Sequence, residues 1–380
     1  MHAARPCARY RLIIGAIGRK RGDTPVAPRI LAQTGATMLS ACSRRQTLKT
    51  LLAAAAAGTA TACGSLTGNS ARAGGSSNGK KVLRLAVQEQ NFATTPLTLG
   101  QDLGFMAKEG LEIRTTIGQS TSTMTAGLMG GSFDLQIGGS ELVVARQQGA
   151  SLIAIAGLCN APIWSVVAKR GISGLADLRN RTIATSGPST VSTVALTTTL
   201  QKAGLGTGSY RMFTAGGTAE RFTAVRNGRA DATVVTSPVE FQAAEQGLRR
   251  LGSLYDTMPH FASGFVVTTK GFASGHDATL VAFCRAWLHT LRWMHDPANE
   301  KELVRRVSRI LGSPASVIQQ AYEYWLTGKR ADALFPADGK IDIAALEGAV
   351  KAFVDHGTMK KGTSIEGFVD QRFLNRAAGA

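Results

Sequence analysis

Short apolar segments alternate with helix-like segments almost without interruption from residue 82 to about residue 255. The first four strands are expected at 82–87, 111–116, 135–137 and 152–156. Between them lie segments with helical spacing, including 122–129 and 142–148. Such alternation is typical of a mostly parallel sheet whose faces are covered by helices. We therefore predict an α/β fold.

A second series of the same kind follows the first. Its strands are expected at 163–168, 183–185, 210–213, 232–235 and 248–251, and its helices include 218–226 and 238–246. Strand 264–268 then begins a return to the first unit, and helices starting near 276, 299, 314 and 343 complete the chain. The two linking segments, one leaving and one returning, predict a hinge. We expect lobe I at 82–164 plus 262–380 and lobe II at 165–261.

The formal charge of +18 is unevenly distributed along the chain. Residues 1–63 hold ten of the 43 basic residues but only one acid, Asp23, so half of the excess belongs to this segment. The other charges are scattered along amphipathic helices, as expected for solvated faces. Because no basic stripe carries interleaved aromatic residues, we predict no nucleic-acid partner.

The leader, residues 1–63, reads as an export signal, and Met38 is the expected true start. A basic region, a short Ala-rich region and a small-residue cleavage site follow Met38. Arg44 and Arg45 resemble a twin-arginine signal. Cys63, followed by a flexible linker at 64–81, resembles a lipoprotein cleavage site, although plain cleavage after Ala62 is the alternative.

If cleavage falls after Ala62, the cysteines that remain besides Cys63 are Cys159 and Cys284, which lie in apolar segments and are predicted to be buried. No Cys or His spacing indicates a metal site, and no motif indicates a cofactor. The one Gly-x-Ser-x-Gly match, 75–79, lies in the linker rather than at a strand-to-helix turn, so it is no nucleophile elbow. We therefore predict that the protein is not an enzyme.

The segment 183–204 runs from a short strand directly into a helix through small hydroxylated residues. Ser186, Gly187, Ser189 and Thr190 leave room for a ligand to approach the backbone, and Pro188 suits a first helical turn. The first N–H groups of a helix have no internal partner and attract negative charge. This junction is a predicted ligand site, with an ordinary helix cap as the alternative.

Similar loops follow other predicted strands, where an open α/β sheet binds its ligands. They contribute the candidate ligand-binding residues Gln90, Asn91, Phe92, Ser120, Thr121, Gly139, Ser140, Glu141, Gly217 and Ser237. Glu89 and Glu141 are positioned to pair with an amine, unless they are solvated or cap a helix. Phe92 and Trp164 are candidate apolar walls or core residues. Ser237 and Glu240 have the spacing of a capping box.

Several motifs carry a resemblance to a known family. They are Gly104-Phe105 with 109–113, 131–134, 175–184, Gly228-Arg-Ala-Asp231, and the C-terminal segments 354–357 and 362–370. Together these motifs resemble the sulfonate/nitrate/taurine substrate-binding proteins of ABC importers over about residues 82–372. The resemblance implies a type II periplasmic-binding-protein fold, with two α/β lobes joined by a hinge. It also implies a monomer in the periplasm, or on the outer face of the inner membrane through a lipid anchor. The implied partners are an importer permease and, through it, an ATPase.

The predicted loops supply neutral donors and contain no arginine or lysine. A singly charged, weakly hydrated group is the anion that such donors hold well, so we expect a small organic anion such as an alkanesulfonate. A pyrimidine or thiamin precursor and an aromatic acid remain alternatives. An enzyme of the thiamin-pyrimidine-synthase type is disfavoured because the chain lacks that relative's cysteine-rich motif.

Overall fold

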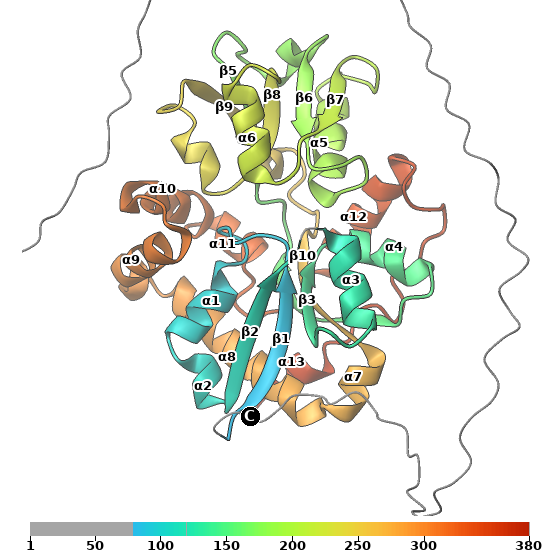
Figure 1. Ribbon diagram of the computed structural model, residues 1–380, viewed down its shortest axis with the longest axis vertical. Coiled ribbons are helices and arrows are strands. Elements are labelled where there is room, and N and C mark those ends of the chain that lie inside the picture. The colour runs from blue at the N-terminus through green and yellow to red at the C-terminus, as the bar shows by residue number, and fades with distance from the viewer. Residues whose placement is uncertain (1–78, 119, 380) are drawn as a thin grey trace, which may run out of the picture. The chain divides into compact units, whose positions relative to one another are not determined.

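The computed structural model describes residues 79–118 and 120–379, in which ten strands form two five-stranded sheets (Figure 1). The first sheet has the order β2-β1-β3-β10-β4. Its strands are β1 (Lys81–Val87), β2 (Leu111–Ile117), β3 (Leu135–Gly138), β4 (Leu152–Cys159) and β10 (Gly264–Thr269). β1 is parallel to β2 and β3, whereas β10 is antiparallel to both β3 and β4. Four strands therefore run one way and the returning strand runs the other.

The second sheet repeats this plan with the order β7-β6-β8-β5-β9. Its strands are β5 (Trp164–Lys169), β6 (Thr182–Thr185), β7 (Arg211–Thr214), β8 (Ala232–Thr236) and β9 (Leu248–Ser253). Here β5 is the reversed strand, antiparallel to β8 and β9. The predicted α/β class and mostly parallel sheets are confirmed. The chain passes between the sheets after β4 and again before β10, while the lobe boundaries at 164/165 and 261/262 stay predictions.

Helices cover both sheets. In the first lobe they are α1 (Thr95–Asp102), α2 (Phe105–Lys108), α3 (Thr121–Met129), α4 (Glu141–Gln147), α7 (Lys270–Gly275), α8 (Asp277–His295), α9 (Glu300–Leu311), α10 (Ala315–Trp325), α11 (Lys329–Leu334), α12 (Ile343–Asp355) and α13 (Arg372–Ala378). The second lobe contains α5 (Val191–Lys202) and α6 (Thr218–Arg226). The 3₁₀ helices are η1 (Leu175–Leu178), η2 (Val239–Gln242), η3 (Leu254–Asp256) and η4 (Pro297–Asn299). Sequence analysis missed α2, α7, α11 and α13.

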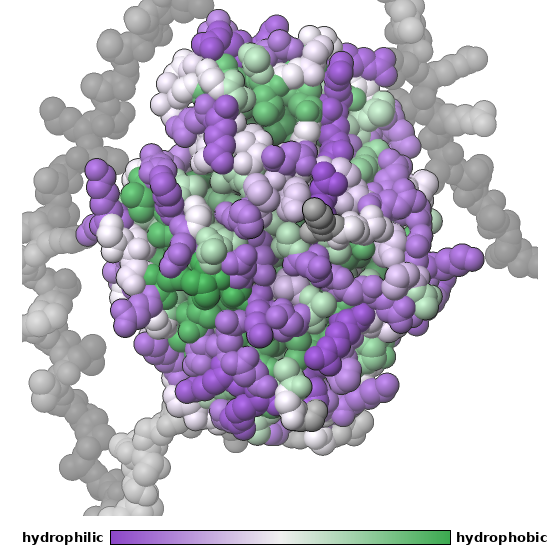
Figure 2. All heavy atoms as spheres, turned by 180° about the vertical axis from the view of Figure 1, so that it is seen from behind, coloured by the Kyte–Doolittle hydropathy of each residue, from purple (hydrophilic) through white to green (hydrophobic). Residues whose placement is uncertain are grey.

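Most apolar strand residues are enclosed on both faces of each sheet, whereas Ile117 of β2 and Met212 of β7 are exposed. Both predicted buried thiols, Cys159 and Cys284, lie in the core, and burial raises the pKa of Cys284 to about 12. The surface seen in Figure 2 is covered largely by hydrophilic side chains, with smaller apolar areas between them. Within the described residues, no helix combines the length and apolarity that a bilayer crossing requires.

Two local predictions are wrong. The expected helix 238–246 is only the 3₁₀ helix η2, and the predicted capping box of Ser237 and Glu240 does not form. Glu240 is buried instead, where its Oε1 accepts a hydrogen bond from Trp325 Nε1 (3.3 Å). Pro188 does not open α5, because the helix begins at Val191. The leader, its cleavage site and Cys63 lie outside the described residues.

Candidate functional site

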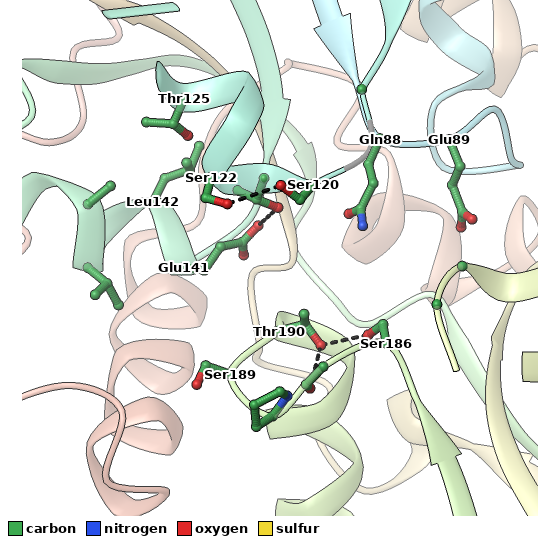
Figure 3. A pocket seen from close by; sticks show the side chains of 18 of the residues that line it. Gln88, Glu89, Ser120, Ser122, Thr125, Glu141, Leu142, Ser186, Ser189 and Thr190 are labelled. Carbon is green, nitrogen blue, oxygen red and sulfur yellow. Dashed lines mark hydrogen bonds between the residues drawn. The ribbon is translucent and has the colours of Figure 1, made fainter. Parts of the chain in front are cut away.

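A cavity of about 1430 Å³ is lined by loops of both lobes (Figure 3). Lobe I contributes the segments that follow β1 and β2 and the first turn of α4. Lobe II contributes the segments that follow β6 and β7. These are carboxyl ends of parallel strands, the edge at which open α/β sheets bind ligands. Small-molecule sites commonly occupy roughly 300–1,000 Å³, so the cavity has room for a ligand and for some closure.

The junction between β6 and α5 forms the lobe II side of this cavity. Ser186 Oγ contacts Thr190 Oγ1 (2.6 Å) and Ser192 Oγ (2.9 Å), and Thr190 Oγ1 also donates to the carbonyl of Gly187 (3.2 Å). Because these bonds occupy the Thr190 hydroxyl, its side chain does not cap α5. The exposed Ser189 hydroxyl has no partner within the described residues. This helix end therefore offers donors to a bound group.

The lobe I side faces this junction across the cavity, as Figure 3 shows for Ser120 and Glu141. Ser120 caps α3 by accepting from the N–H of Thr123 (3.2 Å), and its hydroxyl also contacts Ser122 Oγ (3.0 Å). Thr121 donates to Glu141 Oε1 (3.2 Å), which links the start of α3 to the start of α4. Hydroxyl groups thus line both sides of the cavity.

Glu89, in the loop after β1, reaches across to lobe II. Its Oε1 accepts from Thr218 Oγ1 (2.9 Å), Thr236 Oγ1 (3.2 Å) and Asn91 Nδ2 (3.0 Å). Its Oε2 accepts from the N–H of Thr218 at the start of α6 (3.4 Å). Behind Thr218 lies Arg221, which is 3% exposed; burial lowers its pKa, and the Glu89 charge opposes that shift. Both carboxylate oxygens of Glu89 are therefore satisfied.

Glu141 has no such cross-lobe contact. Its Oε1 accepts from Thr121 and from the N–H of Gly139 (3.3 Å). Its Oε2 is buried and has no hydrogen-bond partner within the described residues. Burial raises the pKa of this carboxyl group, and the hydrogen bonds to the backbone and to Thr121 only partly oppose the rise.

Most of the predicted ligand-binding residues border a cavity. Those on the large cavity are Gln90, Ser120, Thr121, Glu141, Ser186, Gly187, Ser189, Thr190 and Gly217. Asn91 and Gly139 border a smaller adjoining cavity, together with Trp164 and Arg221. The assignment of ligand contacts to these residues stays a prediction.

Three predictions are wrong about where the side chain lies. Phe92 is 1% exposed and packs in the core against Phe335, with ring centroids 6.0 Å apart, so it is no cavity wall. Ser140 is fully buried and donates to the carbonyl of Ala262 (2.6 Å). Ser237 is also fully buried and lines neither cavity.

Sequence reasoning missed several lining residues, among them Gln88, Gln148, Glu220 and Thr358. Glu220 follows the predicted Gly216-Gly217 loop closely enough to have been found. Thr358 comes from the C-terminal segment, and no local pattern ties that segment to the cavity. Within the described residues, no group of three or more His, Cys, Asp and Glu side chains is arranged to hold a metal ion.

Solved structures define the class of this fold. The alkanesulfonate-binding protein SsuA from Xanthomonas axonopodis pv. citri, bound to MOPS, is 16% identical with a TM-score of 0.61, covering 76% of this chain and 98% of its own. The nitrate-binding protein NrtA from Synechocystis PCC 6803 is 13% identical with a TM-score of 0.64, covering 78% and 88%. The desulfurization enzyme DSZB is 14% identical with a TM-score of 0.58, covering 78% and 99%. The protein therefore has the type II periplasmic-binding-protein fold.

The sequence places the chain within a family. Residues 91–300, more than half of the chain, match the family described as NMT1/THI5 like, and the chain belongs to that family. No curated protein matches the sequence. Because the sequence identities are this low, the similarity to the three solved structures shows the fold alone.

Proposed function

We propose that the protein is the substrate-binding component of an ABC importer and captures a small organic anion between its two lobes. The observation that carries this proposal is the cavity of about 1430 Å³, which receives hydroxyl-bearing loops from both sheets. A ligand that contacts both lobes binds best when the lobes close around it, so it shifts the population toward the closed form. The closed form is then the one that the permease recognises.

The N-terminus of α5 is the proposed seat of the acidic group. Its Thr190 side chain does not cap the helix, and Ser189 is free to donate from the adjoining loop. A helix N-terminus carries about half a positive charge, which favours an anion. Among the described residues, no Arg or Lys lines the large cavity, so we expect a weakly hydrated organic acid to bind better than a strongly hydrated inorganic ion.

Calorimetry with ethanesulfonate, propionate, benzoate, nitrate and sulfate tests this proposal. We expect at least one organic acid to bind more tightly than either inorganic anion. Ser189→Asp should abolish binding through like-charge repulsion at the helix end, whereas Arg226→Ala, at the far end of α6, serves as the control. Equal affinity for sulfate and the organic acids, or normal binding by Ser189→Asp, would contradict the assignment.

We infer the cellular location of the protein from the leader. The proposed route is twin-arginine export, with retention on the outer face of the inner membrane through a lipid on Cys63; release into the periplasm follows plain cleavage after Ala62. Cell fractionation of an Arg44→Lys/Arg45→Lys variant and of Cys63→Ala checks both steps. Unchanged export of the first variant removes the twin-arginine route, and membrane retention of the second removes the anchor.

A further inference from the structure

The charged side chains around the cavity are negative, which does not suit a ligand that carries only negative charge. Three carboxylates, Glu89, Glu141 and Glu220, line the large cavity, and no Arg or Lys of residues 79–118 and 120–379 lines it. Arg221 borders only the smaller cavity, where Gly216, Thr218 and Val234 already occupy its guanidinium. In a partly dehydrated cleft, a bare anion meets repulsion from these carboxylates. A group that donates hydrogen bonds or carries positive charge offsets it.

The three carboxylates are not equally available to such a group. Glu89 already accepts hydrogen bonds at both oxygens, including three from lobe II. Glu220 is exposed at the start of α6, where water solvates it. Glu141 alone among them has a buried oxygen, Oε2, that lacks a partner within the described residues.

The position of Glu141 is set by its neighbours. Thr121 and the N–H of Gly139 hold Oε1, and the carboxylate packs closely against Gly139. A Cβ added at residue 139 would lie 2.8 Å from Glu141 Oε2 and 2.6 Å from the carbonyl oxygen of Ser263. Glycine at 139 therefore lets the carboxylate sit beside the backbone at the border of the two cavities. The carboxylate is oriented before any ligand arrives.

A buried acceptor without a donor lowers stability because it has lost its hydrogen bonds to water, and a ligand that supplies the donor recovers that free energy. Burial also raises the pKa of the Glu141 carboxyl group, the expected signature of a carboxylate short of donors. This arrangement makes binding selective. An analogue that lacks the N–H group leaves the acceptor oxygen of the site without a hydrogen bond and therefore binds more weakly.

We propose that Glu141 selects the ligand by accepting a hydrogen bond from its nitrogen, so that the captured molecule carries an amino group as well as an acidic group. This inference rests on the proposed function. The acidic group lies at the N-terminus of α5 and the amino group lies at Glu141, on opposite sides of the cavity (Figure 3). The substrate class is thus a small amino acid or aminosulfonate zwitterion.

Two matched pairs of probes test this selection by calorimetry at pH 7. Taurine and ethanesulfonate differ in the amino group, as do β-alanine and propionate. In the wild-type protein, we expect the amino member of at least one pair to bind at least tenfold more tightly. Glu141→Met removes both carboxylate oxygens and keeps a side chain of similar length, and it should reduce this affinity ratio to one or below. Glu141→Gln, which keeps one acceptor but no charge, should give an intermediate ratio.

Glu347→Gln is the control, because it removes an exposed carboxylate on α12 that lines neither cavity and should leave the ratio unchanged. Circular dichroism and thermal melting establish that each variant is folded, and the Gln variant carries the test if the Met variant is not. Equal wild-type binding within both pairs, or binding confined to nitrogen-free acids, overturns the selection by Glu141 and leaves the importer function standing. An unchanged ratio in Glu141→Gln and Glu141→Met also overturns it. Failure of every organic acid, with or without nitrogen, overturns the proposed function itself.

Discussion

Glu89, in the loop after β1, and Glu141, the first residue of α4 after β3, face the same cavity from lobe I, yet their surroundings differ. Glu89 accepts hydrogen bonds from Thr218 and Thr236 of the other lobe. Within the described part of the chain, Glu141 accepts hydrogen bonds only from its own lobe, and its buried Oε2 has no partner. The difference indicates that Glu89 joins the lobes, and it is consistent with the ligand role that we propose for Glu141.

The contacts of Glu89 explain why it joins the lobes. The N-cap of α6 is Gly217, whose lack of a side chain leaves the first N–H groups of the helix to other acceptors. Glu89 takes this place from lobe I, and its charge opposes the cost of burying Arg221. A carboxylate at a helix N-terminus typically contributes about 0.3–1 kcal/mol, and more when it is partly buried.

Glu240 is a third carboxylate whose hydrogen bonding is intermediate between that of Glu89 and that of Glu141. Its replacement should have the largest effect on the free energy of unfolding. Its Oε1 accepts from Trp325 Nε1, its Oε2 has no partner within the described residues, and burial raises its pKa to about 7. Below pH 4.5, both the folded and unfolded forms are protonated. Between pH 4.5 and 7, the unfolded form loses its proton first, so rising pH lowers the free energy of unfolding by about 3 kcal/mol.

Glu240→Gln should remove this pH dependence while keeping the side-chain shape. The check is urea denaturation of wild type and variant at pH 4.5, 6 and 8, compared as a difference so that other titrating groups cancel. We expect the variant to gain stability relative to wild type as the pH rises. A constant difference across this range would show that Glu240 titrates normally.

Glu89→Gln should have the next largest effect, a loss of about 1–3 kcal/mol in the free energy of unfolding. The variant replaces charge-assisted hydrogen bonds with weaker ones and turns a donor toward the N–H of Thr218. Because these bonds join the lobes, small-angle scattering without ligand should also give a larger radius of gyration. Glu220→Gln is the exposed control, expected within about 0.5 kcal/mol of wild type. A stable Glu89 variant with unchanged dimensions would refute the joining role.

Much of this architecture was predictable from the sequence because it depends on local pattern. The alternation of apolar segments indicated the strands, and the small residues at their ends indicated the loops that line the cavity. Ser186, Ser189 and Thr190 were found in this way. Local pattern therefore indicates which backbone segments reach the cavity, because the loops that follow the strands of an α/β sheet lie at one edge of it.

The direction of a loop side chain was not predictable, because it depends on distant partners. Ser140 turns to the carbonyl of Ala262, and Phe92 packs against Phe335. The cross-lobe donors for Glu89 lie more than a hundred residues away, at Thr218 and Thr236. No local pattern distinguishes Glu89 from Glu141, so their different tasks emerge only from the tertiary contacts.

Glu141→Gln should produce the smallest change in the protein without ligand, and its sign should be opposite to that of Glu89→Gln. Where the wild-type carboxyl group is deprotonated, one of its buried oxygens is unpartnered within the described residues, and a neutral amide reduces that desolvation cost. We expect a gain of about 0–1 kcal/mol in the free energy of unfolding at pH 8, measured by urea denaturation. Because burial raises the pKa of this group in the folded protein, wild type recovers stability as the pH falls and the carboxyl group is protonated, so the gain should shrink toward pH 4. A loss of 1 kcal/mol or more at pH 8 would place Glu141 with Glu89 among the carboxylates that hold the fold together, and the contrast between them would fail.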